Sequence, residues 1–87
     1  MALYDKYFYA REGFSGSGNF EKTFKKRCEY LVLINTGVSD LTVEVNGHVF
    51  MIPSGYTLDE LLEPFDSISV TATDTFCGYV RDEVIRQ

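Results

Sequence analysis

The sequence has little of what metal binding and catalysis need: one histidine, two cysteines and no tryptophan in 87 residues. The cysteines and His48 would offer a zinc ion at most three ligands, and no two of them have the close spacing of a zinc site. No nucleophile elbow is present, and a chain this short can hardly enclose the cleft that paired carboxylates would need. We therefore expect no enzyme, no metal and no cofactor.

Cysteines and long apolar runs are both scarce. Cys28 and Cys77 are too few for a disulfide scaffold, and the sequence has neither a signal peptide nor an apolar run near eighteen residues. We expect a protein that is made in a reducing cytoplasm and does not contact a membrane. Its thiols should be free and mostly buried, with a bridge between neighbouring strands as the alternative.

Basic residues are outnumbered, and the net charge of −5 argues against a nucleic-acid partner. The charge is also unevenly divided. Residues 1–27 carry six basic and three acidic side chains, whereas residues 28–87 carry two basic and ten acidic ones. One end of the chain is therefore basic and the rest is acidic.

Aromatic residues are plentiful, and their bias towards strands favours an all-β fold. Seven of the thirteen fall in the first 24 residues, which is more than one edge strand can bury against its own domain. We expect part of this segment to form an interface, although the aromatic residues could instead complete a small core. The predicted interface residues are Tyr4, Tyr7, Phe8, Tyr9, Phe14, Lys25 and Arg27.

A glycine-rich stretch, residues 13–19, is expected to be a flexible loop. Its glycine spacing imitates a phosphate-binding loop, but Asn19-Phe20 stands where Lys-Ser/Thr must follow, so no nucleotide site is expected. The predicted organisation is an aromatic arm with this loop in residues 1–20, a β-sandwich domain in residues 21–82 and a frayed tail in residues 83–87.

The most readable local structure is a hairpin over residues 41–52, since Asn46-Gly47 suits the positive φ angles of a tight turn. Two registers compete. A two-residue turn pairs Val45 with His48 and buries the histidine, whereas a three-residue loop pairs Glu44 with His48. We favour the three-residue loop, because it directs charge outward and aliphatic side chains inward.

Three further elements complete the prediction. Residues 23–36 form the longest strand, whose second half is apolar on both faces and should be central. Residues 57–63 fit a capping box followed by one or two helical turns, and residues 67–81 form a second hairpin. The predicted fold is all-β, a small antiparallel sandwich or partly open barrel with one short helical turn. An α+β fold with a longer helix at residues 57–63 is the alternative.

Five runs of strand and turn residues carry a resemblance: Leu31-Val-Leu-Ile-Asn-Thr-Gly37, Asp40-Leu-Thr-Val-Glu-Val-Asn-Gly47, Pro53-Ser-Gly55, Glu63-Pro-Phe-Asp-Ser-Ile-Ser-Val-Thr-Ala-Thr73 and Tyr79-Val-Arg81. Over its last two-thirds the chain resembles small β-sandwich proteins encoded among the structural genes of tailed bacteriophages and prophages. The resemblance implies a head decoration, head fibre or tail-associated subunit. Such a protein would be made in the bacterial cytoplasm and incorporated into the virion.

The expected function is accordingly that of a homo-oligomeric virion subunit, whose partners are further copies of itself and other virion proteins. The charge division would let a basic arm dock on a neighbour's acidic body. An alternative is a monomeric module that binds a peptide or a glycan through tyrosines, or one that inhibits a host protein.

Overall fold

The described residues form six antiparallel strands, and none of them is helical. The computed structural model describes residues 5–86, with the side chains of residues 9–82. The strands are β1 (Asp5–Ser17), β2 (Phe20–Asn35), β3 (Leu41–Val45), β4 (His48–Ile52), β5 (Thr57–Thr71) and β6 (Thr75–Arg86). They form one sheet in the order β1-β6-β2-β5-β3-β4, which is not closed into a barrel. The predicted all-β fold is confirmed.

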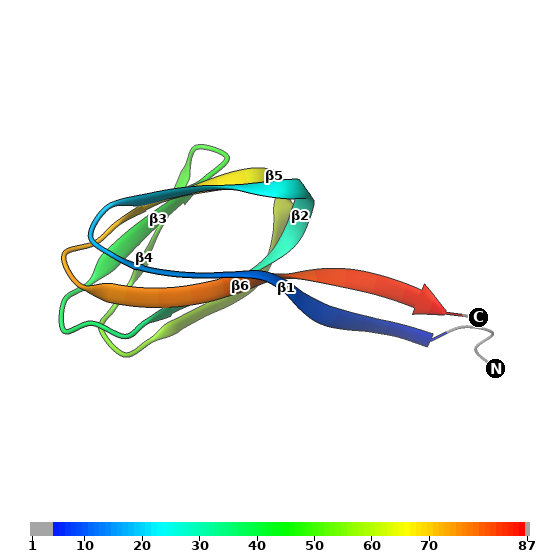
Figure 1. Ribbon diagram of the computed structural model, residues 1–87, viewed down its shortest axis with the longest axis horizontal. Coiled ribbons are helices and arrows are strands. Elements are labelled where there is room, and N and C mark those ends of the chain that lie inside the picture. The colour runs from blue at the N-terminus through cyan, green and yellow to red at the C-terminus, as the bar shows by residue number, and fades with distance from the viewer. Residues whose placement is uncertain (1–4, 87) are drawn as a thin grey trace.

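The sheet curls around its own core because the two longest strands, β2 and β5, bend where their pairing shifts register. Thr23 pairs with Ser67, but Cys28 already pairs with Phe65 and Tyr30 with Leu61. Extra residues on one strand bend it and increase its twist. Figure 1 shows β2 and β5 arching over the molecule, with the β1–β6 ladder along the opposite side.

The core lies inside this curl and is apolar. Its buried side chains come from β2 to β6, and the aromatic rings of Phe65 and Phe76 are among the largest that are fully buried. In β2 the core-facing residues change from Phe24 and Cys28 to Leu31 and Leu33, because the register shift moves the alternation by one residue. The second half of β2 lies between β5 and β6, as its apolar sequence predicts.

The predicted helical turn at residues 57–63 is wrong, because these residues belong to β5. The segment from Thr57 to Leu61 pairs with β2 from Ile34 back to Tyr30. Only six residues lie between Thr57 and Pro64, and a segment this short cannot offset the cost of helix nucleation. The central strand β2 offers a full ladder of backbone hydrogen bonds instead.

The predicted hairpin at residues 67–81 is also wrong, although both of its strands exist. In the sheet order β2 lies between β5 and β6, and β6 pairs with β1 and β2. The turn after Thr71 therefore takes the chain from one side of β2 to the other, across the curled sheet. Alternation identifies a strand, but it does not identify the neighbour with which that strand pairs.

The hairpin at Asn46-Gly47 has the two-residue turn, so the favoured three-residue loop is wrong. Val45 pairs with His48, and φ is +54° at Asn46 and +80° at Gly47. Both angles suit the primed turn whose twist matches that of the strands. The histidine is nevertheless exposed at the end of β4, because the curled sheet leaves this side open.

The predicted arm and tail pair with each other as far as the structure describes them. β1 pairs with β6 from Asp5 with Arg86 to Ser17 with Thr75, and the register shifts between Arg11 and Phe14. Figure 1 shows the outer part of this ladder running past the curled body as a two-stranded ribbon, in which Asp5 pairs with Arg86. Among the described residues no helix is long and apolar enough to span a membrane.

Candidate functional site

Among the side chains that the structure describes, the free edge of β4 is the most exposed apolar part of the sheet. β4 is the last strand in the sheet order, and its sequence His48-Val-Phe-Met-Ile52 contains no carboxylate, lysine or arginine. Val49 is 65% exposed and Met51 is 61% exposed, both on the outer face. Unprotected apolar edges readily pair with another chain.

The register fixes which backbone groups of β4 remain available. The residues beside a two-residue turn form a hydrogen-bonded pair, so His48, Phe50 and Ile52 direct their N–H and C=O groups towards β3. The peptide groups of Val49 and Met51 alternate with these and point to the free edge. This edge can therefore accept a further antiparallel strand.

An apolar pocket of about 290 Å³ lies beside β4, between its inner face and the first half of β5. Phe50, Leu61 and Leu62 supply its apolar surface. At one end the side-chain amide of Asn46 donates hydrogen bonds to the carbonyl oxygens of Glu63 at 3.4 Å and Pro64 at 3.0 Å. The turn is thereby fastened to β5, and at the same end His48 Nε2 lies 3.6 Å from Glu63 Oε1.

The predicted interface residues do not lie in one patch. Tyr9, at 42% exposure, lies on β1, and Lys25 and Arg27 are exposed on the first half of β2. Phe14 instead turns inward, where its ring stacks on Phe20 at 5.7 Å between centroids. Part of the aromatic excess therefore fills the core, which is the alternative left open by the sequence.

Three predicted interface residues lie at the outer end of β1 or beyond it. The backbone of Tyr7 and Phe8 pairs with Val84 and Glu83 of β6, but their side chains lie outside the described part of the structure. Tyr4 lies outside the described residues altogether.

A cluster of charged side chains joins the root of the ribbon to the body. The Arg11 guanidinium donates to Asp82 Oδ2 at 2.6 Å and also forms an ion pair with Glu12. Lys26 Nζ lies 3.1 Å from the same Asp82 oxygen. Partial burial alone would raise the pKa of Asp82, but the hydrogen bonds from Arg11 and Lys26 outweigh it and the pKa is lowered.

The same guanidinium reaches a buried thiol. Arg11 Nη2 lies 3.2 Å from Cys28 Sγ, and burial raises the pKa of Cys28 although the nearby positive charge opposes the shift. A thiol with a raised pKa is a poor nucleophile. Cys28 and Cys77 are both free in the structure, as predicted.

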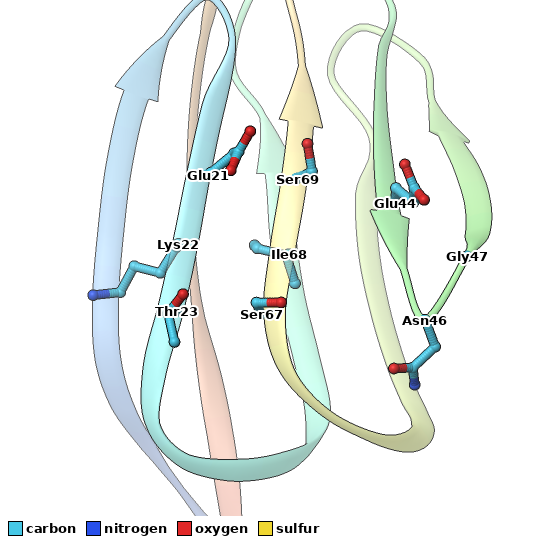
Figure 2. A pocket seen from close by; sticks show the side chains of 9 residues that line it. All are labelled: Glu21, Lys22, Thr23, Glu44, Asn46, Gly47, Ser67, Ile68 and Ser69. Atoms are coloured by element: carbon cyan, nitrogen blue, oxygen red, sulfur yellow. The ribbon is translucent and has the colours of Figure 1, made fainter.

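A shallow hollow of about 420 Å³ lies on the outer face of β2, β5 and β3 (Figure 2). Glu21 and Glu44 pair with Ser69 from either side, so two carboxylates flank a hydroxyl in one row across three strands. The hollow is polar and lacks an aromatic side chain. Within the described residues no group of histidine, cysteine, aspartate or glutamate could hold a metal ion.

The chain matches no protein-family model, no curated protein and no solved structure. The β4 edge was missed as a candidate from the sequence because its exposure depends on the strand order and on the two-residue turn. The available signal was the register choice, since that turn places Val49 and Met51 opposite the core.

Proposed function

We propose that the protein is a non-enzymatic structural or assembly subunit of a tailed-phage virion, in head decoration, a fibre or the tail. It would be made in the host cytoplasm and would act in the virion through repeated protein–protein contacts. The observation that supports this proposal is the pair of dissimilar surfaces at opposite edges of the sheet. One is the apolar β4 edge, and the other is the β1–β6 ribbon with the basic residues at its root.

Two separate contact surfaces are what a repeating assembly requires of each subunit. The β4 edge offers backbone hydrogen bonds and apolar area. The ribbon root offers Lys25 and Arg27, which complement the exposed acids of β5, such as Glu60 and Glu63, on a neighbouring copy. The uneven charge of the sequence thus corresponds to distinct places on the molecule.

The test is to purify particles from the phage or lysogen that carries the gene and to quantify the protein by mass spectrometry. A structural subunit should remain with the particles through a density gradient in many copies per particle. Its gene should also lie beside capsid, portal or tail genes. Absence from washed particles would contradict the proposal.

A second candidate function is a monomeric module that binds a glycan, and the polar hollow of Figure 2 favours it. Hydroxyl and carboxylate groups in one row suit the hydroxyls of a sugar. A glycan array would decide this: a monomeric protein that binds one glycan class, and loses binding in Glu44→Gln, would support the module and contradict the virion subunit.

A further inference from the structure

We propose that β4 pairs with β4 of a second copy in antiparallel orientation about a two-fold axis at Phe50. The sheets of the two copies would then become continuous. This inference deepens the proposed function, on which it rests for the expectation that the protein assembles with itself. It names the strand, the register and the partner.

The free peptide groups of β4 determine the register. With the axis at Phe50, Val49 of one copy lies opposite Met51 of the second copy. These are the two residues whose N–H and C=O groups point to the free edge. Each Val49–Met51 pair can exchange two backbone hydrogen bonds. The same register brings the exposed side chains of both residues from both copies into one apolar cluster on the outer face.

The sequence around β4 is symmetric in the way this pairing needs. Gly47 and Pro53 are equally distant from Phe50, so each end of one strand meets the opposite end of the other. Pro53 has no N–H group and ends the new ladder where the hairpin turn of the second copy begins. His48 falls opposite Ile52 of the second copy, so no charged groups are forced together within the strand pair.

Other exposed edges of the sheet carry features that discourage pairing. β1 has a register shift between Arg11 and Phe14, with a positive φ of +48° at Glu12. The first half of β5 exposes Glu60 and Glu63 along its edge. Irregularities and charges of this kind are the usual protection of edge strands, and β4 has neither.

The salt dependence distinguishes this contact from docking of the basic root on an acidic surface. A two-fold axis at β4 brings the acidic β5 edges of the two copies towards each other, so screening by salt should strengthen the dimer. A contact between Lys25 or Arg27 and the acids of a neighbour should weaken with salt instead. Sedimentation at low and high ionic strength separates the two.

The experiment is analytical ultracentrifugation of the full chain and of two matched variants. Val49→Lys places a charge at the apolar cluster, and like charges so close should raise the dissociation constant of the dimer roughly 100-fold. Val38→Lys is the control, because Val38 is a valine with 85% exposure in the loop between β2 and β3. We expect the control and the wild-type protein to dimerise alike. A monomeric wild-type protein, or equal effects of the two variants, would overturn the inference.

Disulfide trapping tests the register. In a Cys77→Ser background, Val49→Cys protein mixed with Met51→Cys protein should form a covalent dimer on oxidation, since hydrogen-bonded pairs bring Cα atoms within disulfide range. Either protein alone should remain largely uncrosslinked. Efficient crosslinking of one protein alone, or none in the mixture, would overturn the proposed register.

Failure of this inference and failure of the proposed function give different results. A protein that is abundant in washed particles but does not use β4 would retain the virion proposal and refute the β4 dimer. A protein that dimerises through β4 but is absent from particles would retain the β4 dimer and refute the virion proposal.

Discussion

Asn35, at the end of β2, should be among the residues most sensitive to a small chemical change. Its side chain is buried, and its amide nitrogen donates to the carbonyl oxygens of Ser39 at 2.8 Å and Ile52 at 2.9 Å. Its amide oxygen accepts from the Gly37 N–H at 3.0 Å. One side chain thereby holds the loop after β2 and the end of β4 in place.

Asn35→Asp keeps the shape and the acceptor but replaces the donor by an oxygen that faces two carbonyl oxygens. Losing two hydrogen bonds costs about 1–3 kcal/mol, and burying a carboxyl among acceptors adds about 1–3 kcal/mol. We expect the free energy of unfolding to fall by about 2–6 kcal/mol at pH 7. The total stability of a domain this size is about 4–13 kcal/mol, so the loss is a large share.

The loss should depend on pH. Burial raises the pKa of the new carboxyl in the folded state above its value in the unfolded chain. Below the unfolded pKa, near 3.9, both states are protonated and the loss is smallest. It grows as pH rises above that value, because the unfolded state ionises first, and it levels off above the folded pKa.

Urea unfolding followed by circular dichroism between pH 3 and 8 measures this effect. Asn19→Asp is the matched control, because Asn19 is exposed in the turn between β1 and β2. A loss below about 1 kcal/mol at pH 7, or a loss equal to that of the control, would refute the role given to Asn35.

Three other substitutions or reactions test separate parts of the fold. Gly78→Ala places a Cβ against the backbone of β2 and 2.8 Å from the ring of Phe14, so thermal unfolding should show a loss of about 1–3 kcal/mol. Because the pKa of Asp82 is lowered, its stabilising effect is present above the ordinary carboxyl pKa and is lost as pH falls through the folded value. The Asp82→Asn variant should therefore have a lower free energy of unfolding than the wild type at pH 7. On acidification below pH 4 it should lose less of that free energy than the wild type does. Iodoacetamide should modify Cys77 in the native protein and Cys28 only after unfolding, as peptide mass spectrometry would show.

The sequence predicts individual strands well where alternation is strong. β3 alternates cleanly, and Leu41, Val43 and Val45 share the buried face. β4 is apolar at four successive positions, so its sequence pattern does not distinguish between the two registers. The register is set by the twist of the turn and by the face of β3, and the preference for outward charge at His48 led to the wrong choice.

Strand partners and the candidate site could not be predicted in this way. The pairing of β2 with both β5 and β6 joins residues that are far apart in sequence, and local patterns carry no information about it. The same limit applies at residues 57–63. Their sequence has a helical pattern, but the segment is a strand because it pairs with β2. The β4 edge becomes recognisable as a candidate site only when the strand order is known.

The pairing of β1 with β6 has a consequence for synthesis. Asp5 pairs with Arg86, so β1 leaves the ribosome long before β6, and its ladder cannot form until β6 follows. Until then Gly78, which lies beside the inward-facing ring of Phe14, is missing, and the second half of β2 is open on one side. Long-range pairing of this kind slows folding. A nascent chain that stops before β6 should therefore stay unfolded and sensitive to proteases, which makes synthesis of β6 the event that releases folding.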